Sequence, residues 1–389
     1  MTRIPRRDVL ALLGGPLALA LTGSACRIEG PSPTGTGLLG TSLDIQSIDS
    51  GVAWLLAQQD SRGAFPSATY GLLRGGESLT PALLLALQDV APHSSLSVQP
   101  AIDAGLEFLA TKIHASGAIG LSGSVPDYPV YATAMTLHAA ARTEAEQQRR
   151  GFHKCLGWLF DQQLPTNGDW AESPARGGWP MGAARPAKTS QALHVDLSMT
   201  RRALQALAAW EKTASSPFET GRRAATDFVS RSQTPDGGFV YSAASPGLNK
   251  AGPGKGYGSA TCDGLLALAA LGVLEPDFRI QQGLTFLRSA HRTDRNPGLE
   301  GSPMSAFAVA MKGYYRAAAA AVYARFGWSP GQAEAMSTVI RSEQRSDGSW
   351  KNNAVLQKED DPLISTAFAL QALAAIHSST LLVSGEAQP

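Results

Sequence analysis

One seven-residue motif occurs three times in the chain, as Ala-Leu-Gln-Ala-Leu-Ala-Ala at residues 203–209 and 369–375, and as Gly-Leu-Leu-Ala-Leu-Ala-Ala at residues 264–270. Each copy begins three residues after a threonine, and looser copies follow two further threonines. A sixth, less regular copy is the alanine run at residues 317–321. Self-similarity at a roughly fixed spacing indicates one supersecondary unit stacked on itself, so this motif predicts a repeat architecture.

Between these copies lies a second repeated element, an apolar helical stretch that often ends in a glutamine and a glycine turn. The clearest turns are Asp-Gly-Gly-Phe at residues 236–239, after Gln233, and Asp-Gly-Ser-Trp at residues 347–350, after Gln344. Glycine ends a helix because it adopts the left-handed backbone conformation without a Cβ penalty. Each unit is therefore predicted to be a helix, a turn and a second helix, and the chain holds six units.

The two helix types differ in their hydrophobic pattern. The first carries large and aromatic residues, as expected of an outer helix, while the second is rich in Ala and Leu almost all round, which is typical of a helix buried on most sides. Six buried helices ringed by six amphipathic ones predict a closed all-α toroid, an α6/α6 barrel, over residues 44–378, with a tail at residues 379–389. A closed ring has no exposed end repeats, which an open helical solenoid must cap.

The glycine turns carry a resemblance to a known family. The Gln-x-x-Asp-Gly-x-Trp type of turn at residues 344–350 and 233–239 resembles the repeat of squalene and hopene cyclases and of protein prenyltransferase β subunits. The pairing of Gly-Gly-Trp at residues 177–179 with residues 196–200 is similar to bacterial proteins that carry "prenyltransferase and squalene oxidase" repeats. The resemblance implies a terpenoid-cyclase-like toroid, but it is weak for the reaction because one fold hosts many functions.

The catalytic motifs of the families that the chain resembles are missing. Squalene-type cyclases protonate an alkene with an Asp-x-Asp-Asp segment, which this sequence lacks. In the zinc segment of protein prenyltransferases, the resemblance puts Met199 where the ligand histidine should be, and Cys262 is off the ligand position. We therefore predict no cofactor and no family metal site. A new metal site from His194, Asp196 and Cys262 stays open as an alternative, because an imidazole, a carboxylate and a thiolate supply three ligands.

In those families the N-terminal ends of the inner helices face one mouth of the barrel, so the resemblance implies that residues near the repeated threonines converge there. Six positive helix ends around one cavity would also favour an anion. The threonines themselves are interpreted as N-caps of the inner helices. The candidate cavity residues are Asp127, Tyr131, Trp179, His194, Asp196, Tyr257, Cys262, Asp263, Tyr314, Tyr315, Asp360 and Asp361.

Several of these candidates have a second interpretation. The aromatic residues predict either an apolar or cation-stabilising pocket or packing between repeats. The pair of Asp360 and Asp361 is either part of a site or a solvated helix start. Cys155 and Cys262 are expected to be small buried hydrophobic residues.

Two connections are unusually long, at residues 172–193 and 241–256. Loops longer than about 15 residues in a compact domain are usually functional or disordered. We expect both to lie over the mouth. Their Lys188, Lys250 and Lys255 either meet an acidic ligand or stay solvated.

Residues 1–26 read as a targeting segment rather than part of the fold. Arg6 and Arg7 precede an apolar stretch too short to span a membrane, which indicates a twin-arginine signal and export in the folded state. The stretch before Cys26 resembles a lipoprotein cleavage box, so Cys26 is the predicted lipidation site, with an ordinary cut after Ala25 as the alternative. Residues 27–43 are then a flexible tether.

Charge is nearly balanced, with 33 basic and 32 acidic residues and no stripe of Lys and Arg, which argues against nucleic-acid binding. Two functions stay open. The first is an exported, lipid-anchored toroid whose cavity binds an isoprenoid-like or glycan ligand without cyclase chemistry. The second is a terpene cyclase or prenyltransferase type of enzyme with a divergent active site. Export argues against the second, because soluble prenyl diphosphates are cytoplasmic.

Overall fold

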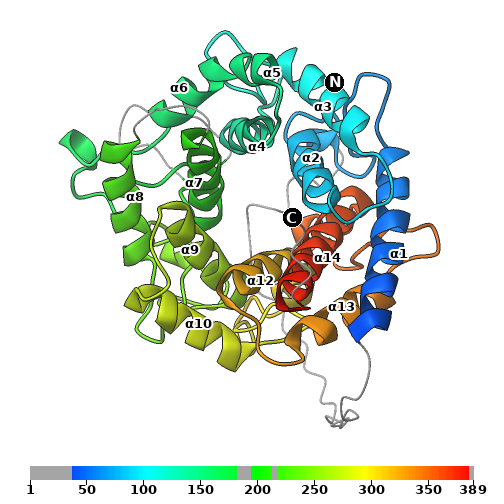
Figure 1. Ribbon diagram of the computed structural model, residues 1–389. Helices are drawn as coiled ribbons and strands as arrows, with labels where there is room; N and C mark the ends of the chain where they lie inside the picture. Colours follow the sequence, from blue (N-terminus) through cyan, green and yellow to red (C-terminus); the bar gives the residue numbers. More distant parts are fainter. Residues whose placement is uncertain (1–36, 182–193, 213–217, 385–389) are drawn as a thin grey trace.

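The computed structural model describes residues 37–181, 194–212 and 218–384. In these residues twelve long helices form two concentric layers, as Figure 1 shows. The inner layer consists of α2 (Leu79–Val90), α4 (Pro129–Ala141), α7 (Leu197–Glu211), α9 (Gly258–Ala270), α12 (Lys312–Phe326) and α14 (Pro362–Ser384). The outer layer consists of α1 (Gly37–Leu56), α3 (Gln99–Ala110), α6 (His153–Asp161), α8 (Glu219–Arg231), α10 (Phe278–Ala290) and α13 (Gln332–Ser342).

The inner layer is a closed ring. Each inner helix contacts the next in chain order, and α14 returns to contact α2. The outer helix α1 packs against α13 and α14, so the first repeat is in contact with the last. The described residues contain no strand, only isolated bridges between Pro180 and Val195 and between Gln233 and Phe239. The predicted all-α toroid of six helix pairs is confirmed.

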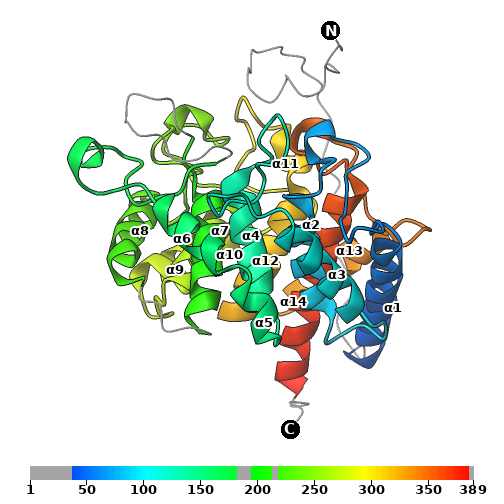
Figure 2. The ribbon, with the colours of Figure 1, turned by 90° about the horizontal axis from the view of Figure 1, so that it is seen from above.

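Shorter helices decorate the ends of the ring. They are α5 (Glu146–Arg150), α11 (Phe307–Ala310) and four 3-10 turns, η1 (Gly71–Leu73), η2 (Gly168–Trp170), η3 (Pro246–Leu248) and η4 (Val355–Gln357). In Figure 2, α11 lies at one end of the barrel, where the chain enters the inner helices, and the last turns of α14 project from the other end. None of the helices in the described part of the chain is long and apolar enough to cross a membrane.

The first and last helices extend beyond residues 44 and 378, the predicted bounds of the toroid. Helix α1 begins at Gly37, so it includes residues 37–43. The prolines that suggested a tether end at Pro33, and nothing after them prevents a helix. At the other end, α14 continues past residue 378 to Ser384, because no glycine or proline interrupts it before Gly385. The remaining parts of the predicted signal segment, tether and tail lie outside the described residues.

The repeated threonines do not cap the inner helices. Each lies within the helix, and its Oγ1 accepts the backbone N–H of the apolar residue that ends the preceding glycine turn. The threonine therefore ties the turn to the inner helix of the same repeat. The donor and acceptor residues, with their N···O distances, are Phe65 and Thr80 at 2.9 Å, Ile119 and Thr133 at 2.9 Å, Trp179 and Thr200 at 3.2 Å, Phe239 and Thr261 at 3.0 Å, and Trp350 and Thr366 at 3.0 Å.

The glutamine of the repeated turn joins neighbouring repeats. Gln344 Nε2 donates to the carbonyl of Gly348 at 2.8 Å and to that of Ser47 in α1 at 2.9 Å. Gln233 Nε2 makes the equivalent pair of bonds, to Gly237 and to Arg279 in α10. The last repeat is therefore joined to the first by the same contact that joins two interior repeats, as a ring requires.

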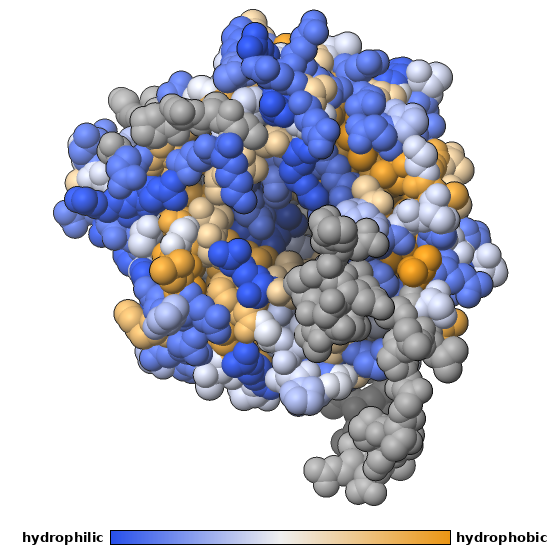
Figure 3. Space-filling view, viewed as in Figure 1, coloured by the Kyte–Doolittle hydropathy of each residue, from blue (hydrophilic) through white to orange (hydrophobic). Residues whose placement is uncertain are grey.

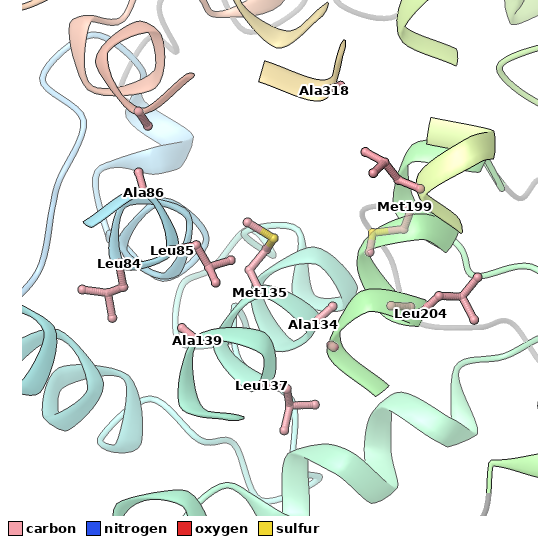
Figure 4. Packing of buried hydrophobic residues seen from close by; sticks show 14 of the residues in the cluster. Leu84, Leu85, Ala86, Ala134, Met135, Leu137, Ala139, Met199, Leu204 and Ala318 are labelled. Atoms are coloured by element: carbon pink, nitrogen blue, oxygen red, sulfur yellow. The ribbon is translucent and has the colours of Figure 1, made fainter. Parts of the chain in front are cut away.

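Packing between inner helices uses their Ala, Leu and Met residues. Leu85 of α2 and Met135 of α4 are both nearly fully buried, and Figure 4 shows them side by side between these helices. Leu137, on the opposite side of α4, points toward the outer layer in the same view. Small residues such as Ala134 and Ala139 are also buried. The inner helices are thus buried on several sides, as their unbroken apolar pattern predicted.

Candidate functional site

A cavity of about 260 Å³ lies at the centre of the ring. All six inner helices contribute to its wall, and we call it the lumen. Figure 3 shows the hollow at the centre of the molecule, with hydrophilic residues on its wall. The polar residues of the wall are Asp89, His138, Arg142, Arg201, Arg202, Gln205, Tyr314, Gln371 and Ser378.

The C-terminal ends of α2 and α4 place one ion pair on the wall. Arg142 Nη1 lies 2.7 Å from Asp89 Oδ1, and Gln371 Nε2 donates to the other oxygen of Asp89 at 3.1 Å. Both side chains of the ion pair are about one-third exposed. This group is therefore a hydrated, neutralised edge of the lumen.

A second ion pair lies at the other end of the wall and is fully buried. Arg201 Nε is 3.0 Å from Asp263 Oδ1, and their side chains are only 4% and 3% exposed. The Nε–H makes no hydrogen bond with that oxygen, so the contact is an ion pair without good hydrogen-bond geometry. Tyr314 donates its hydroxyl to Asp263 at 2.7 Å and lies 3.0 Å from the Ser198 hydroxyl. Burial raises the pKa of Asp263, while Arg201 and the Tyr314 hydroxyl oppose that rise.

Arg202 follows Arg201 on α7 and also lines the lumen. Within the described part of the chain its guanidinium has neither a hydrogen bond nor an ion pair. Burial and the neighbouring charge of Arg201 lower the pKa of Arg202. An arginine keeps its charge under all ordinary conditions, so the lumen holds one guanidinium without a counter-charge.

Two further polar groups on the wall lack partners among the described residues. They are Nδ1 of His138 and Oε1 of Gln205, both buried. Burial, followed by the charge of Arg142, lowers the pKa of His138 to about 3, so its imidazole is neutral near pH 7. Native proteins rarely leave buried polar groups without a bond, which makes each one a candidate for ligand contact.

Most of the candidate carboxylates from the sequence are helix caps. Asp196 accepts the N–H of Met199 at 2.8 Å, and Asp361 accepts that of Leu363 at 2.9 Å. Asp127 accepts the N–H and the hydroxyl of Ser78 at the start of α2, while Asp360 accepts the Tyr70 hydroxyl. Asp360 thus binds a tyrosine hydroxyl, whereas Asp127, Asp196 and Asp361 satisfy amides that the first turn of a helix leaves free. The same role falls to two residues that the sequence did not indicate, Asn296 for α9 and Glu359 for α12.

The aromatic candidates mostly belong to the packing between the layers. Trp179, Tyr257 and Tyr315 are at most 1% exposed, and Trp179 Nε1 donates to the carbonyl of Leu159 at 2.9 Å. Tyr131 is partly buried against the core. Tyr314 is the candidate among the twelve that lines the lumen.

His194 and Asp196 do come together, at the entrance side of α7. His194 Nε2 lies 3.6 Å from Asp196 Oδ2, which also accepts the Tyr241 hydroxyl at 3.1 Å. Lys250 sits with its Nζ 4.5 Å from the centre of the Tyr241 ring, while Lys255 is exposed. Burial lowers the pKa of Lys250. Lys188 lies outside the described residues.

The cysteines are inert in this environment. Cys155 and Cys262 are both buried and unpaired, and burial raises the pKa of both thiols. In the described ranges, no three His, Cys, Asp or Glu side chains are placed to share a metal ion. His194, Asp196 and Cys262 therefore do not form the three-ligand site that their spacing left open.

Neither a protein-family model nor a curated protein sequence matches the chain. Solved structures do. An apo variant of the type II terpene cyclase MstE from Scytonema aligns with a TM-score of 0.58 at 14% identity, over 88% of this chain and 99% of that chain. A variant of the same cyclase, solved with its substrate geranylgeranyl dihydroxybenzoate, aligns with a TM-score of 0.57 at 14% identity and the same coverage.

The chain has the α/α-toroid fold of the terpenoid cyclases. A glycosidase variant also shares this toroid, with a TM-score of 0.50 at 14% identity, over 87% of this chain and 98% of that chain. Likeness at such identities shows the fold alone, and the neighbours themselves differ in chemistry. The function of this toroid must therefore be argued from its lumen.

Apart from Tyr314, the sequence did not indicate the polar residues of the lumen. The interior of α7 contains Arg201, Arg202 and Gln205, whereas the predicted site residues lie near the starts of the inner helices. One signal could have found them. Adjacent arginines in an otherwise Ala- and Leu-rich inner helix cannot both face packed neighbours, because a buried charge needs a partner or water.

Proposed function

We propose that this toroid is a binding protein whose lumen takes a small polar ligand, such as a sugar unit, and that it has no cyclase activity. The observation that carries the proposal is the composition of the wall. His138 and Gln205 offer buried polar groups without partners among the described residues, and the partly buried Arg202 beside them has no partner there either. An isoprenoid chain would cover these groups without bonding to them, which is costly, whereas hydroxyl groups would satisfy them.

The acid that a cyclase requires has no counterpart on the wall. Protonating an alkene needs a carboxylic acid whose partners make it strongly acidic. Asp89 on the wall and the buried Asp263, which pairs with Arg201 of the wall, each lie beside an arginine, and burial raises the pKa of Asp263 rather than lowering it. These features favour binding over the alternative of a divergent cyclase or prenyltransferase.

Occupancy of the lumen can be tested with a variant that fills it. Ala321 of α12 is on the wall, and Ala321→Phe should block the space, whereas Ala335→Phe on the exposed face of α13 is the matched control. We expect saturation-transfer NMR to detect D-glucuronate or D-glucose with the wild-type protein and with the control, but not with Ala321→Phe. Retention of farnesol in place of both sugars, or turnover of squalene, would contradict the proposal.

We also propose that the toroid is exported and held at a membrane by lipid on Cys26. The support is the sequence alone, through Arg6, Arg7 and the residues before Cys26. Changing Arg6 and Arg7 to lysine should leave precursor in the cytoplasm, while Arg3→Lys, the control, should not. Cys26→Ser should convert a membrane-bound protein into a released one, as fractionation and immunoblotting would show. A serine variant that stays in the membrane fraction would remove the lipid anchor from the proposal.

A further inference from the structure

The charges on the lumen wall do not balance. Arg142 and Arg201 are paired with Asp89 and Asp263, and Arg202 has no acidic partner in the residues that the structure describes. His138 adds no charge near pH 7 because its pKa is depressed to about 3 by burial and by the arginines around it. The wall therefore carries an excess of one positive charge. Arg202 is partly buried on this wall and lies next to the charge of Arg201, so a single negative charge in the lumen would complete this site.

The polar groups near Arg202 indicate which other functional groups the ligand must have. Gln205 lies three residues further along α7, on the same face of that helix as Arg202, and its Oε1 has no donor among the described residues. A ligand hydroxyl would supply that donor. Four cationic side chains act on His138. They are Arg142 at the end of α4, Arg201 and Arg202 within α7, and Lys212 at the end of α7. A neutral imidazole in this position serves one more hydroxyl, as donor or acceptor.

On the basis of the proposed binding function, we infer that the ligand is a hydroxylated carboxylic acid, such as a sugar acid, with its carboxylate on Arg202 and its hydroxyl groups near Gln205 and His138. The planar guanidinium matches a carboxylate in two parallel hydrogen bonds, which are among the strongest that a neutral or charged side chain makes. Leu85 and Leu266 provide apolar surface for the carbon skeleton of such a ligand.

A phosphate group fits this wall less well than a carboxylate. Near pH 7 a phosphate monoester carries close to two negative charges. Only one positive charge is in excess on the wall, and the second would have to come from protonating His138. The four cationic side chains that face His138 oppose that protonation. The inference therefore commits to the carboxylate.

Isothermal titration calorimetry with D-glucuronate and its neutral amide, D-glucuronamide, tests the class of ligand, because the two probes differ in charge and hardly in shape. We expect the wild-type protein to bind the acid about 10-fold to 100-fold more tightly than the amide, as a charge-assisted contact with Arg202 implies. Arg202→Gln should bring the two dissociation constants within about 3-fold of each other, because it weakens the binding of the acid far more than that of the amide. Arg223→Gln, which replaces an exposed arginine of α8, should behave as wild type.

The thermal stability of the empty protein gives a readout that does not depend on the probe. Because Arg202→Gln removes a partly buried charge that has no partner among the described residues and that lies beside Arg201, it should raise Tm, while Arg223→Gln should leave Tm unchanged. A lower Tm for Arg202→Gln would overturn the inference, because it would show that Arg202 already has a partner.

The remaining outcomes separate the inference from the proposed function. Equal binding of acid and amide in the lumen would overturn the carboxylate and leave the proposed polar binding site intact. Tighter binding of glucose 6-phosphate than of glucuronate would have the same meaning. Glucuronate binding that is no tighter than that of acetate would show a site for a counter-ion only, and would also overturn the inference. If no sugar binds and Ala321→Phe changes nothing, the proposed function itself fails.

Discussion

Replacing Gly348 with alanine is expected to lower the free energy of unfolding by about 3 kcal/mol. Two effects add at this position. Gly348 has φ of 91°, in the left-handed region that L-residues avoid. A Cβ there would also lie 2.4 Å from the carbonyl oxygen of Ser50 in α1, so the last turn and the first helix would have to separate. Because this contact closes the ring, its loss exposes both end repeats.

Gly272 is the matched control for this prediction. Its φ is 81°, but a Cβ would meet nothing within 4 Å, so Gly272→Ala isolates the backbone strain. We expect it to cost about 1 kcal/mol in urea denaturation, so that the difference between the variants reports the close approach to α1. Equal losses for the two variants would show that α1 moves away at little cost and that ring closure adds little to stability.

The fold could be predicted because the same glycine turn and the same Ala- and Leu-rich helix recur along the chain. Glycine at positions such as Gly237 and Gly348 is required by a positive φ and by the carbonyl of the next outer helix, only 2.6 and 2.4 Å from where a Cβ would be. A glycine therefore marks these two junctions in the sequence, and the second of them closes the ring. The role of the threonines could not be predicted in the same way. A hydroxyl near a helix start suits either a cap or a bond to a preceding turn, and only the position of Trp350 relative to Thr366 distinguishes them.

The lumen was harder to predict than the ring. The apolar pattern of an inner helix does not indicate which face points to the centre, so that pattern did not assign Arg202 and Gln205, which lie inside α7, to the lumen. Polar residues are concentrated near the starts of the inner helices, which is why the sequence predicted the site there. In the structure, those at Asp127, Asp196 and Asp361 bind the free amides of the first turns. Capping and ligand binding use the same residue types, and sequence alone does not separate them.

Asp263→Asn is expected to cost about 3–5 kcal/mol of unfolding free energy at pH 7, because it leaves the buried Arg201 without a counter-ion beside the already unpaired Arg202. The double variant Arg201→Met/Asp263→Leu removes both charges and should recover most of the loss, to within about 2 kcal/mol of wild type. Denaturation curves of the three proteins provide the measurement.

The exposed pair of Arg150 and Glu146, with side chains 69% and 65% exposed, provides the control. Glu146→Gln should cost less than about 0.5 kcal/mol, because solvent screens that pair. A similarly small loss for Asp263→Asn would mean that the Asp263 carboxyl is already uncharged in the folded protein, since burial raises its pKa and an amide would then replace it at little cost. In that case the lumen would carry two unmatched guanidinium groups rather than one, and its ligand would have to bring two negative charges. The unfolding free energy of Asp263→Asn therefore distinguishes a lumen that needs a monoanionic ligand from one that needs a dianionic ligand.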